Sequence, residues 1–232
     1  MTNAFFVTGT DTDAGKTVVT RTLIASGVKS GYRTTGFKPI ASGSTLTVYG
    51  MRNSDALYLQ AASQPELAYE EVNPFTFEPP IAPHIAARQA GVEICPDKLS
   101  SGLYHLKQKS DLVFVEGAGG WRVPLSETTK FSDWVKQENL PVILVVGVKL
   151  GCLNHAMLTA EAIERDGLTL AGWVANLVDP ETSCYDENLR YLEAMLPAPK
   201  LGEIPHLPDI GKRDLTEYLN LELLGFPASV QL

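Results

Sequence analysis

The stretch 4-AFFVTGTDTDAGKTVVTRTL-23 decides the fold, because an apolar run is followed by a glycine-bearing loop and then by a periodic pattern. An apolar strand, a loop with Gly9 and Gly15, and a Gly-Lys-Thr sequence that opens a helix are typical of a phosphate-binding loop. In such a loop, successive backbone N–H groups and the helix N-terminus surround a phosphate. Lys16 is expected to neutralise phosphate oxygens, and the Thr17 hydroxyl to reach Mg²⁺. Five residues separate the two glycines instead of the usual four, and the alternative is an ordinary strand–helix turn.

Further apolar runs have the same continuous, non-alternating character, which predicts strands buried on both faces of a parallel sheet. The runs are residues 4–8, 112–116, 141–147 and 170–176, with a weaker one at 33–40. Helical patterns lie between them at residues 16–31, 154–167 and 185–196. Strand–helix alternation over this length predicts an α/β fold of the P-loop NTPase kind, with a doubly wound, mainly parallel sheet flanked by helices. The proline-rich segments 73–84 and 197–209 are expected to be structured loops.

The composition suits a single domain that spans residues 1–232, since 44% of the residues are hydrophobic and 20% are charged. The formal net charge of −8 argues against a nucleic-acid or membrane partner, because both require clustered Lys and Arg. Cys95, Cys152 and Cys184 are too widely spaced for a paired metal site and are expected to be free thiols in a reducing cytoplasm. The longest apolar run, 140–148, is too short to cross a bilayer. We therefore expect a cytoplasmic protein.

A carboxylate that helps to hold Mg²⁺ is expected at the end of another strand. Glu116 ends the run 112–116 and precedes 117-GAGG-120, whose glycines permit a ligand to approach the backbone closely. Asp55, in 52-RNSDA-56, is either a further oxygen ligand or a helix N-cap.

Two polar residues also stand at predicted strand ends. Lys38 lies between an apolar segment and a Ser/Gly loop, a context that favours a fixed charge facing a ligand over a solvated surface lysine. Asn176 closes the run 170–176 and either hydrogen-bonds an adenine edge or forms a turn.

Together these segments closely resemble the dethiobiotin synthetase family, and they occur in that family's order from about residue 4 to about residue 206. The segments are VTGTDTDAGKT at 7–17, GYRTTGFKPIASGS at 31–44, RNSDA at 52–56, VNPFTF at 72–77, VEGAGGW at 115–121, LPVILVVGVKLGCLNHAMLT at 140–159 and LAGWVAN at 170–176. The resemblance implies an ATP- and Mg²⁺-dependent ligase that acts as a homodimer. It also implies that 7,8-diaminononanoate and CO₂ are the substrates and that the enzyme closes a cyclic urea.

The resemblance assigns roles to individual positions. Thr12, Lys16 and Lys38 are implied as catalytic residues, and Thr17, Asp55 and Glu116 as the metal ligands. The positions implied to bind nucleotide are Asp13, Ala14, Gly15, Lys16, Thr17, Val18, Asp55, Glu116, Gly117, Ala118, Gly119, Asn176, Leu177, Pro205, His206 and Leu207. Those implied to bind the second substrate are Thr12, Ser42, Leu150, Gly151, Cys152, Leu153 and Asn154. The last five begin a helix whose N-terminus is implied to receive a carboxylate from the neighbouring subunit.

The chain departs from the family pattern at two places. Asp13 stands where a longer acidic residue is expected. The tyrosine expected from the partner subunit aligns with Asn188, between Tyr185 and Tyr191.

The implied reaction joins a carbamate to the γ-phosphate of ATP, and a second amine then closes the ring. Two unit charges about 4 Å apart interact by roughly 4 kcal/mol at an effective dielectric of about 20, so the repulsion between these two anions is a substantial barrier. Lys16, Lys38 and Mg²⁺ are expected to offset it. We also expect Lys38→Ala to reduce turnover while folding stays intact.

Other classes of nucleotide-binding protein are alternatives to this reading. A partitioning-type P-loop ATPase carries a signature lysine five positions before the P-loop lysine, and Asp11 occupies that position here. Amide-forming synthetases of cofactor biosynthesis usually carry an added glutaminase domain, for which 232 residues leave no room. A non-catalytic nucleotide-binding module is the third alternative.

Overall fold

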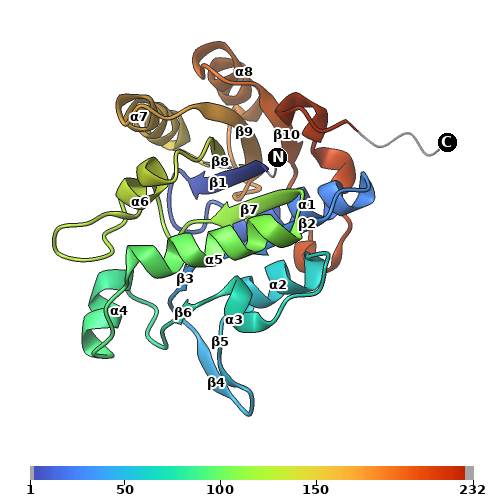
Figure 1. The fold of residues 1–232 in the computed structure, drawn as a ribbon. Helices are drawn as coiled ribbons and strands as arrows, with labels where there is room; N and C mark the ends of the chain where they lie inside the picture. The colour runs from blue at the N-terminus through green and yellow to red at the C-terminus, as the bar shows by residue number, and fades with distance from the viewer. Residues whose placement is uncertain (1–2, 228–232) are drawn as a thin grey trace.

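Strand β1 (Asn3–Gly9) lies at the centre of the fold, and its residues after Asn3 are buried. The computed structural model describes residues 3–227. Within this range β1 belongs to a six-stranded sheet whose neighbouring strands are all parallel, in the order β10-β9-β8-β1-β7-β2 (Figure 1). The other strands of this sheet are β2 (Thr34–Phe37), β7 (Leu112–Glu116), β8 (Val142–Val148), β9 (Leu170–Leu177) and β10 (Lys200–Ile204). The predicted doubly wound, parallel sheet is confirmed.

Helices cover both faces of the sheet, and adjacent residues of β2 show how closely they pack. A Cβ at Gly36 would lie 2.6 Å from Ile24 Cδ1 and 2.8 Å from Leu59 Cβ, so the helices that carry these two residues approach the backbone itself. Phe37 points to the opposite face, where a Cβ at Gly102 would lie 3.0 Å from its ring. The helices on the first face are α1 (Lys16–Lys29) and α2 (Ser54–Ala62), and the one on the second is α5 (Pro96–Lys109).

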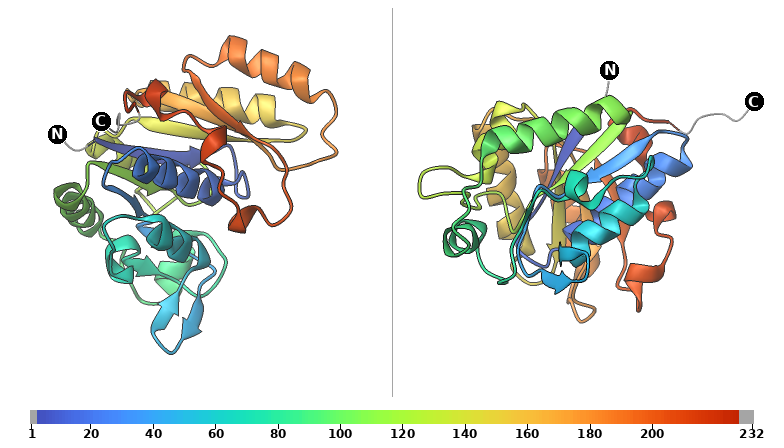
Figure 2. Two further views of the ribbon diagram at one scale, coloured as in Figure 1. Left: turned by 90° about the vertical axis from the view of Figure 1, so that its right-hand side faces the viewer. Right: turned by 60° about the horizontal axis from the view of Figure 1, so that its bottom comes forward.

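The remaining helices connect the strands or pack at the rim of the sheet (Figures 1 and 2). They are α3 (Tyr69–Val72), α4 (Pro83–Gln89), α6 (Phe131–Gln137), α7 (Cys152–Arg165) and α8 (Tyr185–Met195), followed by short 3₁₀ helices at Ile210–Lys212, Thr216–Tyr218 and Leu221–Leu224. Gly31 and Gly167, which follow α1 and α7, have φ angles of 89° and 78°, as expected for glycines that end helices. In residues 3–227 no helix is both long and apolar enough to cross a bilayer.

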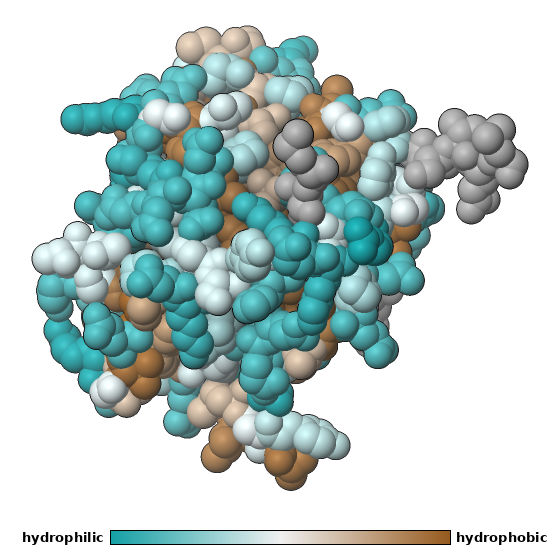
Figure 3. Space-filling model, viewed as in Figure 1, coloured by the Kyte–Doolittle hydropathy of each residue, from teal (hydrophilic) through white to brown (hydrophobic). Residues whose placement is uncertain are grey.

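A small subregion is inserted between β2 and β7. Strand β3 (Ile40–Ala41) pairs in parallel with β6 (Phe75–Thr76), and β4 (Thr45–Thr47) forms a hairpin with β5 (Gly50–Arg52). This hairpin projects from the lower end of the molecule in Figure 1 and in the left view of Figure 2. Its Leu46, Val48 and Tyr49 are exposed, and brown atoms mark the same end of the molecule in Figure 3.

Three boundary expectations are wrong. Segment 73–84 is not a loop throughout, because it contains strand β6 and the first two residues of α4. Segment 197–209 is not a loop throughout, because residues 200–204 form the edge strand β10. The run 33–40 is not one strand, because the chain leaves the main sheet after Phe37 and re-enters extended structure only at Ile40. Lys38 and Pro39 therefore lie between two sheets.

Candidate active site

The loop between β1 and α1 has the strand–loop–helix context of a phosphate-binding loop. Asp13 and Gly15 both have positive φ angles, of 60° and 90°, which turn the chain sharply ahead of α1. A Cβ at Gly15 would lie 2.0 Å from Asn176 Nδ2, so glycine is required there for space as well as for its conformation. The Asn176 amide donates a hydrogen bond of 3.0 Å to the Ala14 carbonyl and so supports the loop from β9.

Lys16 is 7% exposed and lies along the inside of this loop, where its ammonium group donates to the Asp11 carbonyl at 3.1 Å. Burial lowers the pKa of Lys16, and the nearby charge of Glu116 opposes this shift. A single carbonyl does not balance the charge of a buried ammonium group, so Lys16 is suited to bind an anionic ligand.

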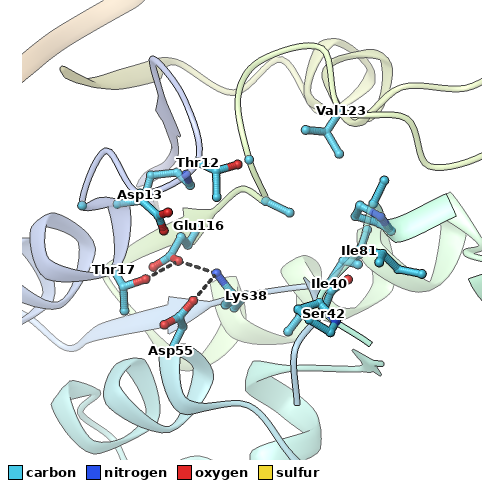
Figure 4. A pocket seen from close by; sticks show the side chains of 18 of the residues that line it. Thr12, Asp13, Thr17, Lys38, Ile40, Ser42, Asp55, Ile81, Glu116 and Val123 are labelled. Carbon is cyan, nitrogen blue, oxygen red and sulfur yellow. Dashed lines mark hydrogen bonds and ion pairs between the residues drawn. The ribbon is translucent and has the colours of Figure 1, made fainter. Parts of the chain in front are cut away.

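Glu116, at the end of β7, is fully buried and accepts two hydrogen bonds on one oxygen. Thr17 Oγ1 donates to Glu116 Oε1 at 2.8 Å, and Lys38 Nζ donates to the same atom at 2.5 Å. Lys38 Nζ also lies 3.2 Å from Asp55 Oδ2, so this one ammonium group joins two carboxylates (Figure 4). Four side chains from β7, α1, α2 and the β2–β3 connection therefore meet at one point.

Lys38 is 5% exposed, so it is not a solvated loop lysine, and we now expect its removal to affect folding as well as turnover. Burial disfavours the charged form, but the ion pairs with Glu116 and Asp55 outweigh burial and raise the pKa of Lys38. Lys38 therefore stays protonated, and removing it would leave the Glu116 carboxylate buried without a counter-charge.

Asp55 is not the N-cap of α2. Asn53 occupies that position, and its side-chain oxygen accepts from the backbone N–H groups of Asp55 and Ala56 at 3.1 and 3.3 Å. The Asp55 carboxylate lies in the first turn of the helix with 40% of its side chain exposed, and it is free to face Lys38.

These groups form one end of a cavity of about 700 Å³. Its other side is apolar, and Figure 4 shows Ile40, Ile81 and Val123 pointing into the space opposite the carboxylates. The apolar lining consists of Ile40, Ala41, Pro80, Ile81, Ala82, Pro83, Val123 and Pro124. The sequence analysis missed this wall. The signal for part of it is 79-PPIAP-83, an apolar and proline-rich segment without helix or strand periodicity.

Half of the predicted site residues line this cavity, and Ala14 and Gly117 are adjacent in sequence to residues that do. Those that line it are Thr12, Asp13, Gly15, Lys16, Thr17, Val18, Lys38, Ser42, Asp55, Glu116, Ala118 and Gly119. Ser42 Oγ is buried and forms no hydrogen bond within residues 3–227, so a hydroxyl at the cavity is left for a ligand.

Two predicted groups lie outside the cavity. Asn176 and Leu177 end β9 beside the end of β10, where Ile204 pairs with Asn176 and is followed by the segment 205–207. In the described part of the chain, the Asn176 Oδ1 atom is buried and accepts no hydrogen bond. The segment 150–154 begins α7, and its Leu150 is 99% exposed.

The cluster at Glu116 fits a hard cation. Glu116 Oε2 is buried and has no hydrogen-bond partner among residues 3–227, and the Asp55 carboxylate and the Thr17 hydroxyl lie on the same side of the cavity. No group of three or more His, Cys, Asp or Glu residues suited to a metal occurs in this part of the chain. Mg²⁺ nevertheless fits, because it is typically held by one or two carboxylates together with phosphate oxygens and water.

A family model described as an AAA domain matches residues 3–214. The chain is 60% identical over 208 residues to the ATP-dependent dethiobiotin synthetase BioD of Photobacterium profundum, with 90% of this chain and 94% of the relative covered. The chain belongs to the dethiobiotin synthetase family. A second member, BioD 1 of Escherichia coli O157:H7, is 56% identical over 225 residues and is covered completely, with 97% of this chain included.

Solved structures outside the dethiobiotin synthetase family share the fold. The ParA family ATPase of Chlorobium tepidum has a TM-score of 0.57 at 13% identity, with 98% of this chain and 95% of that chain covered. The septum site-determining protein MinD of Pyrococcus horikoshii has a TM-score of 0.54 at 18% identity, with 100% and 92% covered. At these identities the likeness extends to the fold alone.

Proposed function

We propose that this chain is an ATP-dependent dethiobiotin synthetase of biotin biosynthesis. It joins CO₂ to 7,8-diaminononanoate, closes the cyclic urea of dethiobiotin, and releases ADP and phosphate. The observation that carries this proposal is the division of one cavity into a charged end and an apolar wall. A triphosphate suits the end with Lys16 and Lys38, while the methylene chain of a long diamine suits the wall with Ile81 and Val123.

In the proposed reaction an amine of the substrate adds to CO₂ and loses a proton, which gives a carbamate. A carbamate oxygen then attacks the γ-phosphorus, the bond to the β-phosphate oxygen breaks, and ADP leaves. The second amine attacks the carbonyl carbon of this mixed anhydride, so that the new C–N bond closes the ring and phosphate departs. The reaction needs no covalent bond to the protein, in agreement with a cavity lining that, among residues 3–227, holds no Cys and no His.

Lys16 and Lys38 have the central electrostatic role in this proposal. Both are buried, so their charges act in a medium of lower effective dielectric than water and interact strongly with the transferring group. Thr12 and Ser42 would orient the diamine through their hydroxyl groups. The Ser42 hydroxyl is suited to this because it has no hydrogen bond within the described residues.

Thr17, Asp55 and Glu116 would hold Mg²⁺, which when bound neutralises charge on the β- and γ-phosphate oxygens. Lys38 forms ion pairs with both Asp55 and Glu116, so the protein itself balances part of the negative charge at this site.

The nucleotide base is proposed to bind beside the ends of β9 and β10. Asn176 would present its amide there, and segment 205–207 would lie along the base. A homodimer is proposed in which the helix that begins at 150–154 receives the carboxylate of the substrate bound to the neighbouring subunit. The protein is proposed to act in the cytoplasm.

A partitioning-type ATPase is the alternative, since such proteins share the fold. Asp11 contradicts it, because this position carries a lysine in those proteins. The Asp11 side chain instead accepts a hydrogen bond from the Thr12 backbone N–H and lies 3.9 Å from Lys149 Nζ.

The test is phosphate release from ATP with 7,8-diaminononanoate and bicarbonate, measured together and with each omitted in turn. We expect release to require both and to match the formation of a product whose mass corresponds to the diamine plus CO₂ minus water. ATP hydrolysis that is independent of the diamine would support a switch ATPase and contradict the proposal.

A further inference from the structure

The loop that follows Glu116 forms part of the cavity wall. Ala118, Gly119, Val123 and Pro124 line the cavity, whereas Trp121 and Arg122, two of the three residues between Gly119 and Val123, hold the loop to another element. One side of the loop thus faces the cavity, and the other side packs against the rest of the protein.

The second side is held by Asp166, the C-cap residue that directly follows α7. Trp121 Nε1 donates to Asp166 Oδ2 at 2.9 Å, and Arg122 donates to both carboxylate oxygens at 2.5 and 3.2 Å. Lys136 Nζ lies 3.8 Å from Asp166 Oδ1. Only 10% of the Asp166 side chain is exposed, whereas Arg122 and Lys136 are partly exposed, so the anchor has a mostly buried carboxylate and partly exposed cations.

The position of Asp166 on its helix is electrostatically unfavourable. A carboxylate at a helix C-terminus faces the negative end of the helix dipole and the unpaired carbonyl groups there. Arg122 relieves this in part, since its guanidinium also donates to the Ala162 carbonyl in the last turn at 3.4 Å. Helix stability therefore does not explain an acid at this position, whereas its contacts with the loop do.

The glycine-rich first part of this loop packs against the phosphate-binding loop. A Cβ at Gly119 would lie 3.7 Å from Thr12 Oγ1, and a Cβ at Gly120 would lie 3.6 Å from the Gly9 carbonyl. The Trp121 ring packs edge-on against Phe6 of β1, with centroids 5.9 Å apart. The loop is thus packed between the cavity and the central strand, and Asp166 sets its position from outside.

We propose that Asp166 is a positioning residue for the ligase reaction, acting through Trp121 and Arg122 on the wall formed by Val123 and Pro124. This inference rests on the proposed function, since it assigns the wall to the diamine. Asp166 does not line the cavity, and its effect is expected to be larger on the diamine subsite than on the nucleotide site, because Val123 and Pro124 of the apolar wall directly follow Arg122.

The experiment compares Asp166→Asn, Trp121→Phe and Arg122→Lys with the wild type. Asp111→Asn is the matched control, because Asp111 also pairs with an arginine, Arg33, through both carboxylate oxygens, but at the opposite edge of the sheet. Each protein is assayed for the KM of the diamine, the KM of ATP and kcat. Hydrogen–deuterium exchange of peptides that cover residues 117–124 is measured without substrates.

We expect Asp166→Asn to reduce kcat/KM for the diamine by roughly 10- to 100-fold, with the KM of ATP within about twofold of wild type. Exchange in residues 117–124 should rise, and Trp121→Phe and Arg122→Lys should give smaller effects in the same direction. Asp111→Asn should alter stability without altering these kinetic constants. The inference is overturned if Asp166→Asn, Trp121→Phe and Arg122→Lys lower the melting temperature yet keep wild-type kinetic constants. It is also overturned if the KM values of ATP and the diamine rise equally.

The two proposals fail in distinguishable ways. If the wild type does not consume ATP with the diamine and bicarbonate, the proposed function is wrong. Faster exchange in residues 117–124 of Asp166→Asn would still establish the anchor in that case. If the wild type is active and exchange is unchanged in all three variants, the anchor is wrong and the function stands.

Discussion

Lys38 Nζ lies 2.5 Å from Glu116 Oε1 and 3.2 Å from Asp55 Oδ2, so one ammonium group is shared by two carboxylates that approach it from different elements. Glu116 is fully buried and Lys38 is almost so, whereas Asp55 is open to the cavity. This arrangement makes charge balance at the site a condition of stability as well as of activity.

Replacing Lys38 with Met should therefore affect both properties. Turnover should fall by about 100-fold or more, because a positive group near the transferring phosphoryl is lost. The free energy of unfolding should fall by about 3 kcal/mol, because Glu116 is left buried without its partner. Urea denaturation of Lys38→Met and of Lys38→Met/Glu116→Gln measures the second effect. The double variant should be the more stable of the two and equally inactive. Near-native turnover in Lys38→Met would contradict the role of this lysine.

Thr17→Val should weaken the binding of Mg²⁺ that supports activity. The hydroxyl that donates to Glu116 is lost while the shape of the side chain is kept, and the loss of one contact of about 1.4 kcal/mol corresponds to a tenfold change in affinity. The Mg²⁺ concentration for half-maximal rate should rise by about tenfold. Thr22→Val is the control, because Thr22 lies on the same helix and its hydroxyl bonds only the Val18 carbonyl among the described residues. Equal metal dependence in both variants would count against the metal site.

Gly15→Ala should weaken nucleotide binding for two reasons, one from backbone conformation and one from lack of space. The positive φ costs about 1–3 kcal/mol for a non-glycine residue, and the new Cβ would also collide with the Asn176 amide. Gly167→Ala has a similar φ but nothing within 4 Å of its new Cβ, so it isolates the conformational cost. Calorimetric titration with an ATP analogue should show weaker binding for Gly15→Ala and unchanged binding for Gly167→Ala. Similar binding by both would show that the contact with Asn176 has no role in holding the loop.

The stability contributed by Asp166 should depend on pH. Burial alone would raise the pKa of Asp166, but hydrogen bonds from Arg122 and Trp121 outweigh burial and lower it below its usual range. Its contribution to stability is therefore complete above the unfolded pKa, near 3.8, and is lost as pH falls through the lower folded value. Wild type should exceed Asp166→Asn in unfolding free energy by about 1–3 kcal/mol at pH 7, and the difference should shrink below about pH 4. Urea denaturation at pH 7, 5 and 3 provides the measurement, and a constant difference would contradict the assignment.

The central strands and the phosphate loop could be predicted because their signals are local. The runs that became β1, β7, β8 and β9 are continuous and apolar since both faces are covered by helices. Strand β10 was missed because it is an edge strand, in which Lys200, Gly202 and Glu203 are only partly buried. Helix α5 was not predicted either, although Leu99, Leu103 and Leu106 repeat at helical spacing and are its buried positions.

The candidate site was predictable to the extent that its residues follow strands. Lys16 opens the helix that follows β1, and Glu116 is the last residue of β7; because these two strands are neighbours in the sheet, the proximity of the two residues follows from the fold. The partnership of Lys38 with Glu116 depends on tertiary packing across 78 residues and could not be read from local pattern. The wall formed by residues 80–83 was missed for the same reason, because a loop without periodicity does not indicate which surface it covers.

The bond between Thr17 and Glu116 spans 99 residues of chain, and it exists only once β7 has paired with β1. A polypeptide that ends before residue 112 would contain the sequence of the phosphate-binding loop but would lack Glu116. Such a fragment is therefore expected not to hydrolyse ATP, since Glu116 belongs to the proposed metal site.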